Sequence, residues 1–174
     1  MSLSLNIPTV ETERLILREM RESDLDVIAE FFESDRSHFV GGPKSRGESW
    51  RVISGVLGHW LLRGYGMWLV EERVSGQPVG GVGHLNPEGW DEPELGWHLY
   101  TGHEGKGYAY EAALAAREYG ARHFGLTAPI SYIDPANTRS KALAERLGAR
   151  FEREGEVLGH ACHVYRYPET EGAR

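Results

Sequence analysis

The chain has 174 residues, of which 40% are hydrophobic and 26% are charged, as in an ordinary globular protein. This length predicts one domain over residues 1–174, with an ordered core over about residues 10–168 that buries a sizeable apolar interior. The net charge of −7 and the pI near 5.6 argue against binding to nucleic acid or to an anionic membrane. We therefore expect neither of these partners.

Cysteine content and hydropathy limit the compartment and the kinds of site. The single cysteine, Cys162, excludes an internal disulfide framework and a thiolate cluster. No apolar run approaches the length of a membrane span, and the N-terminus lacks the basic and apolar regions of a signal peptide. These features predict a cytoplasmic protein.

The first elements are a strand and a helix. Leu15 and Leu17 alternate with other side chains over residues 14–20, which predicts a strand with one face in the core. Ser23 then stands where a helix cap is expected, and the helix ends near residue 34. Its apolar face consists of Leu25, Ile28 and Phe32.

A polar loop and a second helix follow. The loop covers residues 35–44, and Ser45 with Glu48 forms the capping-box pattern that starts a helix. Gly55 and Gly58 weaken this helix by about 1 kcal/mol each relative to alanine, so we expect it to depend on packing. Its apolar stripe consists of Trp50, Ile53, Leu57 and Trp60.

The middle of the chain predicts three strands. Residues 67–72 and 78–85 form a hairpin around the turn at residues 75–76, and residues 86–93 form a loop. Residues 94–100 then alternate between two faces, as a strand does. One face carries Leu95, Trp97 and Leu99, and the other carries Glu94, Gly96, His98 and Tyr100.

A glycine-rich loop joins this strand to a long helix. Residues 104–109 read Glu-Gly-Lys-Gly-Tyr-Ala, and the alanine-rich helix that follows stops near Gly125. Unpaired N–H groups at such a helix start favour phosphate binding. A Walker loop requires Ser or Thr where Gly107 follows Lys106, and a dinucleotide fingerprint requires a small residue where Tyr110 stands. The pattern therefore indicates a phosphate compound of another type.

The last third predicts a strand over residues 130–133, a helix from the cap Asn137 to Gly148, and strands over residues 150–157 and 160–166. The long helix is a right-handed crossover, so the strand before it and the strand after it are parallel. The predicted fold is a single α+β domain with a mixed, mostly antiparallel sheet of about seven strands and about four helices.

A possible metal site near the C-terminus is excluded by strand geometry. His160 and Cys162 face one side of a strand and His163 faces the other, so these residues do not converge on one ion. We expect no metal, and we expect Cys162 to be a buried small residue.

Three motifs together resemble those of the GNAT superfamily of acyl-CoA-dependent N-acyltransferases. Residues 94–99 read ELGWHL, residues 105–112 read GKGYAYEA, and Asn137, Ser140 and residues 147–148 form the later N-x-x-S…L-G pattern. The opening ETERLILR over residues 11–18 is also typical. The resemblance covers nearly the whole chain and is strongest to the branch that includes the ribosomal-protein N-terminal alanine acetyltransferases.

The resemblance implies a splayed pair of parallel strands with acetyl-CoA between them. The diphosphate would meet the N–H groups of the glycine loop, and the pantetheine would pair with the main chain of the preceding strand. Asn137 and Ser140 would complete the cofactor site. The full set of cofactor-binding residues is His98, Leu99, Tyr100, Gly105, Lys106, Gly107, Tyr108, Ala109, Asn137 and Ser140.

The resemblance also implies catalytic roles. Glu94 or His84 would take a proton from the amine, directly or through water, and a main-chain N–H of residues 97–100 would hold the oxyanion. Many relatives protonate the thiolate with a tyrosine where this chain has Ala144, so Ser140 is the candidate acid. Glu104 departs from the usual Gln or Arg, and its carboxylate would repel the diphosphate.

The implied activity is transfer of an acetyl group from acetyl-CoA to a primary amine, by direct attack in a ternary complex. The acceptor is a peptide N-terminus or a small-molecule amine, and its pocket would involve residues 35–44, residues 50–60 and the last two strands. An alternative is a CoA-binding sensor without turnover, and a further alternative is a site for another nucleotide. Monomer and homodimer both remain open.

Overall fold

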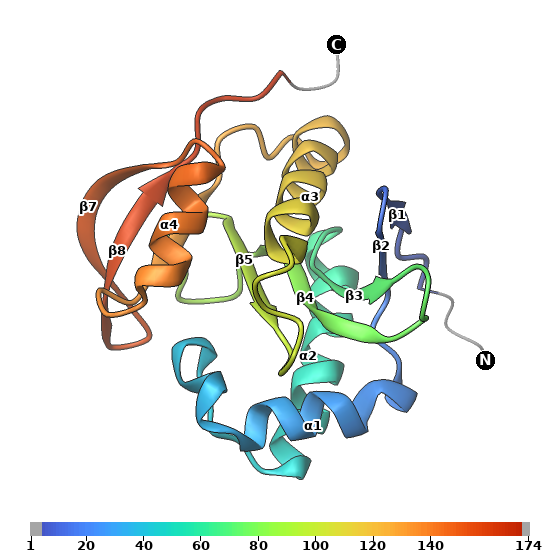
Figure 1. Cartoon of the computed structure of the whole chain (residues 1–174). Coiled ribbons are helices and arrows are strands. Elements are labelled where there is room, and N and C mark those ends of the chain that lie inside the picture. The colour runs from blue at the N-terminus through green and yellow to red at the C-terminus, as the bar shows by residue number, and fades with distance from the viewer. Residues whose placement is uncertain (1–4, 172–174) are drawn as a thin grey trace.

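A sheet of eight strands runs through the molecule, whose computed structural model describes residues 5–171 (Figure 1). The strand order is β1-β2-β3-β4-β5-β6-β8-β7, and β5 with β6 is the parallel pair among antiparallel neighbours. The strands are β1 (Val10–Glu11), β2 (Leu15–Arg18), β3 (Met67–Glu72), β4 (Pro78–Leu85), β5 (Glu94–Leu99), β6 (Ile130–Ile133), β7 (Arg150–Val157) and β8 (His160–Arg166).

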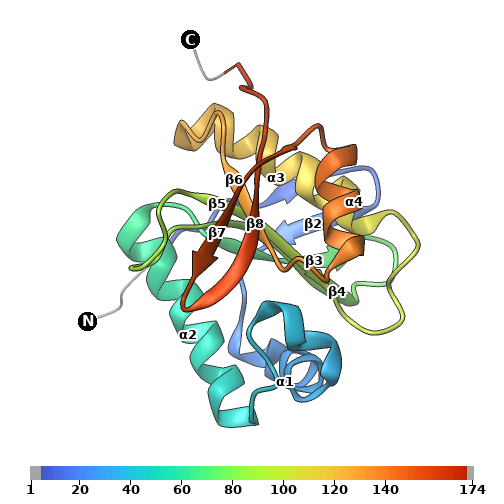
Figure 2. The ribbon, with the colours of Figure 1, turned by 90° about the vertical axis from the view of Figure 1, so that its left-hand side faces the viewer.

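Helices cover both faces of the sheet. Figures 1 and 2 show α3 and α4 on one side and α1 and α2 on the other. The helices are α1 (Leu25–Glu33), α2 (Arg46–Arg63), α3 (Tyr108–Phe124) and α4 (Thr138–Arg146), with 3₁₀ turns η1 (Glu22–Asp24) and η2 (Asp35–Val40). The predicted α+β class and mixed sheet are confirmed. The sheet has one strand more than the seven that the sequence predicts. The additional strand is β1, whose two residues are too few to show an alternating pattern. Residues 1–4 and 172–174 of the predicted domain lie outside the described residues.

The core has two layers because α3 and α1–α2 each bury a stripe against the sheet. Beneath α3, Ala113 and Ala116 pack in the same cluster as Leu17, Trp68 and Val82, and their small side chains allow close packing. Beneath α1 and α2, a second cluster contains Ile28, Phe31, Phe32, Ile53 and Leu69. Each fully buried large side chain contributes about 1.5–3 kcal/mol to stability.

The start of the first helix differs from the prediction. Ser23 lies inside η1 rather than at a cap. Asp24 is buried and accepts both Arg18 Nη1 and Nη2 at 2.9 Å, an ion pair between residues that no local pattern connects. Residues 35–44 are also more ordered than a loop, because Ser37 N–H bonds Ser34 O at 3.1 Å and η2 forms.

The second helix confirms its predicted cap but not its whole stripe. Ser45 and Glu48 form the capping box, and Ile53 and Trp60 are buried at 4% exposure each. Trp50 is 47% exposed, and its Nε1–H donates to Glu22 Oε1 at 3.0 Å. The stripe prediction was wrong at Trp50 because its side chain lies at the surface, where it bonds Glu22 of η1, and not in the core.

The parallel strands β5 and β6 separate, as expected for the splayed pair. They share one paired position, Glu94 with Ile130, at their N-terminal ends. Beyond it, Ser131 Oγ–H donates to Leu95 O at 2.5 Å and Tyr132 N–H donates to Glu94 Oε1 at 3.3 Å. Side chains thereby satisfy the main-chain groups that the separation leaves without a strand partner.

Candidate active site

The N-terminus of α3 leaves its first N–H groups available. Gly107 is the N-cap with φ +81°, a conformation that favours glycine, and no side chain caps the helix. The first intrahelical bond runs from Glu111 N–H to Gly107 O at 3.1 Å. The N–H groups of Tyr108, Ala109 and Tyr110 precede that bond, so they carry the positive end of the helix dipole.

The loop before α3 is fixed from the side of β2. Arg14 Nη1–H donates to Lys106 O at 2.9 Å, and Arg14 Nε–H donates to Glu111 Oε2 at 2.7 Å. Tyr108 is buried, and its hydroxyl bonds Glu72. Lys106 Nζ lies 5.8 Å from the centre of the Tyr108 ring. These contacts preorganise the loop and add a cation beside its N–H groups.

Glu104, which the sequence predicts to repel a diphosphate, is paired. Its carboxylate forms an ion pair with Arg36 and accepts Gly102 N–H at 2.8 Å. Arg36 also donates from Nη2 to Leu99 O at 3.3 Å. The guanidinium of η2 therefore offsets the negative charge next to the glycine loop.

The main-chain groups of β5 alternate between β4 and the split. Tyr100 N–H donates to Val79 O at 2.9 Å, so the even-numbered residues face β4. Leu95 O faces Ser131 on the other edge, and Trp97 and Leu99 follow the same alternation. Leu99 therefore presents its main-chain N–H to the split, with Trp97 beside it, while the Leu99 carbonyl accepts Arg36. The main chains of His98 and Tyr100, also predicted to bind the cofactor, pair toward β4.

Glu94 lies where β5 and β6 part. Its Oε2 accepts Trp90 Nε1–H at 2.7 Å, and its Oε1 accepts Tyr132 N–H. Burial raises the pKa of Glu94 to about 7, and the two hydrogen bonds act in the opposite direction. A carboxylate with a pKa near neutrality is suited to accept and release protons.

His84 and His98 lie on opposite faces of the sheet. His84 has 0% exposure, and its Nε2 lies 3.0 Å from Ala116 O beneath α3, where Gly120 leaves room for the ring. His98 stacks on Phe31 at 4.9 Å on the α1 face. Burial lowers the pKa of each histidine to about 4, so both are neutral at pH 7. The geometry does not favour His84 as a base, because its side chain is fully buried beneath α3.

The N-terminus of α4 lies at the same edge of the sheet as that of α3, because each helix follows one of the two parallel strands. Asn137 Oδ1 accepts Ser140 N–H at 3.1 Å and caps α4. In the described part of the chain, the Ser140 hydroxyl has no hydrogen-bond partner. Ala144, at the position of the tyrosine of many relatives, has 0% exposure.

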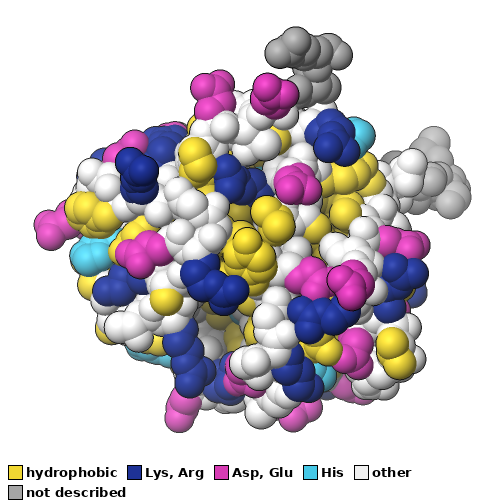
Figure 3. Space-filling view, turned by 45° about the horizontal axis from the view of Figure 1, so that its top comes forward, with side chains coloured by type: hydrophobic (Ala, Val, Ile, Leu, Met, Phe, Trp, Pro, Cys, Tyr) yellow, Lys and Arg dark blue, Asp and Glu magenta, His cyan; other side chains and the backbone are white. Residues whose placement is uncertain are grey.

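The outer face of α3 carries a groove of about 600 Å³ next to Gly107. Figure 3 shows the side of the molecule nearest α3, where hydrophobic side chains lie among charged ones of both signs. Tyr110 and Leu114 line the groove, and Arg146 of α4 lies 4.7 Å from the Tyr110 ring centre. The groove is on the opposite side of the sheet from His98.

The described residues contain neither a metal site nor a membrane-spanning helix. Within residues 5–171, no three His, Cys, Asp or Glu side chains gather where they would hold a metal ion. No helix in that range is both long enough and apolar enough to cross a membrane. Cys162 is buried at 4% exposure, as expected.

Sequence reasoning missed four residues of this region. Trp90, Tyr132, Ser131 and Arg36 contact the predicted site from segments that lie elsewhere in the chain. Trp90 stands in a predicted loop, and only its proximity to Glu94 in sequence was a signal. The other contacts depend on strand separation and on η2, which no local pattern reveals.

Known proteins resemble this chain over most of its length. A profile of the acetyltransferase (GNAT) domain matches residues 14–150. YoaA of Bacillus subtilis, described as an uncharacterised N-acetyltransferase, is 27% identical over 153 residues, with 85% of each chain covered. An acetyltransferase structure from Agrobacterium tumefaciens has a TM-score of 0.88 and 37% identity, covering 97% of this chain and 99% of that chain.

A more distant structure shares the fold. The ribosomal-protein acetyltransferase RimL, in complex with coenzyme A, has a TM-score of 0.76 at 18% identity, covering 91% of this chain and 97% of that chain. The family profile spans most of the sequence, and the split between β5 and β6 with the open start of α3 is the arrangement expected from the motifs. The chain therefore belongs to the GNAT acetyltransferase family and is an acetyltransferase.

Proposed function

We propose that the protein transfers an acetyl group from acetyl-CoA to a primary amine, either a peptide N-terminus or a small molecule, by direct attack in a ternary complex. The observation that carries this proposal is the split between β5 and β6, which opens beside the uncapped N-terminus of α3. A thioester at the split and a diphosphate at the helix start would be held by one continuous edge.

The residues present fit coenzyme A. The N–H groups of Tyr108, Ala109 and Tyr110 and the cation of Lys106 suit a diphosphate. The main chain of Trp97 and Leu99 at the edge of β5 suits the amides of pantetheine, which would pair as an added strand does. RimL, which shares the fold, was solved with coenzyme A, and this supports the assignment.

The candidate base is Glu94. An amine with a pKa near 10 is mostly protonated at neutral pH and must lose a proton before it attacks. Glu94 has a pKa of about 7, so a large fraction of it is ionised near neutrality, and it accepts that proton directly or through water. His84 is left out of the proposal because it is buried beneath α3.

The remaining roles fall to the edge of β5 and to α4. A main-chain N–H of Trp97 or Leu99 would hold the oxyanion, and the Ser140 hydroxyl would protonate the departing thiolate. Ser140→Ala is expected to lower kcat more than it changes KM, because the proton is needed only as the thiolate leaves. Steady-state kinetics with both constants at wild-type values would assign Ser140 to the capping turn alone.

The activity is tested by measuring thiol release from acetyl-CoA with a panel of amines that includes peptides and polyamines. Turnover with one class of amine is the expected result. Ala144 leaves no tyrosine hydroxyl at the usual position, which favours a CoA-binding sensor as the second candidate. Tight CoA binding without turnover on any amine would support the sensor, and calorimetry that detects ATP or NAD but not CoA would contradict both.

A further inference from the structure

The loop between β4 and β5, residues 86–93, contacts Glu94 through one side chain. Trp90 Nε1–H donates to Glu94 Oε2 at 2.7 Å. The Trp90 ring also meets Tyr132 edge to face, with 6.2 Å between centres and 87° between planes. Because Tyr132 N–H donates to Glu94 Oε1, each carboxylate oxygen has one donor, and both donors come from groups that pack together.

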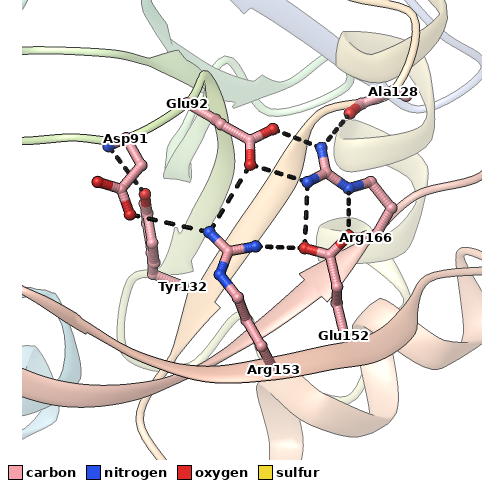
Figure 4. Close-up of polar contacts among 7 residues, drawn as sticks. All are labelled: Asp91, Glu92, Ala128, Tyr132, Glu152, Arg153 and Arg166. Atoms are coloured by element: carbon pink, nitrogen blue, oxygen red, sulfur yellow. Dashed lines mark hydrogen bonds and ion pairs between the residues drawn. The ribbon is translucent and has the colours of Figure 1, made fainter.

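The same loop is fastened to β6, β7 and β8 by the contacts in Figure 4. Asp91 N–H donates to the Tyr132 hydroxyl at 3.1 Å, and Arg153 lies 3.8 Å from Asp91 and 3.7 Å from Glu92. The centre of the network is Arg166, near the end of β8. These contacts therefore hold the loop in place beside Glu94.

Arg166 uses all five of its N–H groups. Nη1 and Nη2 donate to the two oxygens of Glu92 at 2.5 and 2.8 Å, and Nη1 also donates to Ala128 O at 3.1 Å. Nε and Nη2 donate to the two oxygens of Glu152 at 3.0 and 3.1 Å. A lysine has three donors on one atom and cannot form two bidentate pairs at once. This geometry joins the segments that precede β5 and β6 at the closed end of the split.

We propose that Trp90 is a positioning residue for the catalytic carboxylate Glu94, and that Arg166 holds Trp90 in place through Glu92. This inference rests on the proposed function, in which Glu94 is the base. The Trp90 N–H orients one oxygen of the Glu94 carboxylate and favours the charged form of that carboxylate. The ion pairs of Arg166 with Glu92 and Glu152 fix the loop that carries the indole. The acetyl-transfer step itself involves neither Trp90 nor Arg166.

The indole N–H of Trp90 should have a measurable effect on the pKa of Glu94, because the other titratable groups around Glu94 are neutral. The titratable groups that face it are Tyr132 on β6, Cys162 on β8 and Tyr167 after β8, and burial raises the pKa of all three, so they are neutral at pH 7. In the described part of the chain, no cation forms an ion pair with Glu94. Burial raises the pKa of Glu94 to about 7, and the Trp90 bond opposes that rise, so its removal should raise the pKa further.

The test compares Trp90→Phe with Trp50→Phe, which is the matched control for the pKa of Glu94 only. Trp50 also donates Nε1–H to a glutamate, Glu22, but on the surface of α2. The pKa of Glu94 is read by NMR of ¹³C-labelled glutamate, assigned with Glu94→Gln, and the pH dependence of kcat/KM is measured in parallel. Loss of one hydrogen bond to a carboxylate should raise both midpoints by about one pH unit in Trp90→Phe. Relative to wild type, kcat/KM should fall about fivefold at pH 7 and recover by pH 9.

The outcomes separate this inference from the proposed function. Unchanged midpoints in Trp90→Phe, with an acid limb still present in the wild type, would overturn the positioning role and leave the acetyltransferase proposal intact. A shift of the NMR midpoint without a shift of the kinetic limb would remove Glu94 as the base, and the catalytic role of Trp90 with it. An equal shift of the NMR midpoint of Glu94 in Trp50→Phe would also overturn the inference.

A second experiment tests the role of Arg166 with the variant Arg166→Lys. Its control is Arg153→Lys, at another arginine of the same network. Arg166→Lys keeps the charge and loses the paired bidentate geometry, so it should shift the acid limb in the same direction as Trp90→Phe. The double variant should shift the limb no further than Trp90→Phe alone, because both changes act through one indole. Additive shifts, or an unshifted limb in Arg166→Lys with normal thermal unfolding, would show that Arg166 does not act through Trp90.

Discussion

At the scale of single residues, Glu94 is held in an environment that disfavours its charged form. Its pKa rises from 4.5 to about 7, so the folded state binds the proton more tightly than the unfolded state between these values. The contribution of Glu94 to stability is fully present below about pH 4.5 and falls as the pH rises through 7. The protein keeps a carboxylate where a neutral side chain would be more stable, which is common at active sites.

Glu94→Gln should therefore stabilise the protein in a pH-dependent way. Relative to wild type, the free energy of unfolding of the variant should be higher at pH 8 than at pH 5 by about 1–3 kcal/mol, because the amide does not ionise and the carboxylate is partly screened by solvent. Urea unfolding at the two pH values measures this. An equal difference between variant and wild type at both values would show that the Glu94 pKa is not raised.

A second prediction at the scale of single residues concerns the ion pair between Arg36 and Glu104. The Glu104 carboxylate stands next to the glycine loop and is paired with Arg36. Arg36→Gln should weaken CoA binding about tenfold, because the carboxylate is then left facing the diphosphate. Glu104→Gln added to that variant should restore affinity. Calorimetry that finds the double variant as weak as Arg36→Gln alone would mean that Arg36 acts on CoA directly and not through Glu104.

At the scale of elements, α2 contains two glycines that destabilise it and that alanine can replace. Gly55 and Gly58 have no heavy atom within 4 Å of an added Cβ and have ordinary helical φ. Gly64, at the C-cap, also has open space around it, but its φ is +77°. Gly55→Ala and Gly58→Ala should each raise the free energy of unfolding by about 0.5–1 kcal/mol, whereas Gly64→Ala should lower it by about 1 kcal/mol. Thermal unfolding of the three variants compares them, and a uniform sign would refute this account of α2.

The elements themselves were largely predictable from the sequence. The bounds of β3, β4, β6, β7 and β8 match the predicted strands, because turn or loop residues mark the ends of each strand in the sequence. The misses are β1, the predicted cap at Ser23, η2 and the exposed position of Trp50, which depend on sheet pairing and on packing between distant segments. Local patterns carry no information about such contacts.

At the scale of the whole molecule, the site is assembled from both layers. The parallel pair lets α3 and α4 begin at one edge of the sheet, while η2 contributes Arg36 and the loop before β5 contributes Trp90. The glycine loop, Glu94 and Ser140 could be proposed from motifs, because each lies in a local pattern, and their roles stay predictions. The face on which His84 lies could not be read, since the glycines of β4 interrupt its alternation.

The most direct test of the central claim, that the start of α3 holds the diphosphate of CoA, is calorimetric titration of CoA into wild type, Gly107→Asn and Gly107→Asp. Asparagine and aspartate both tolerate positive φ and have nearly the same shape, so their difference reports charge at the helix start. Wild type should bind CoA, and the Asp variant should bind about tenfold more weakly than the Asn variant. Equal affinity of the two variants, or no binding by wild type, would contradict the account.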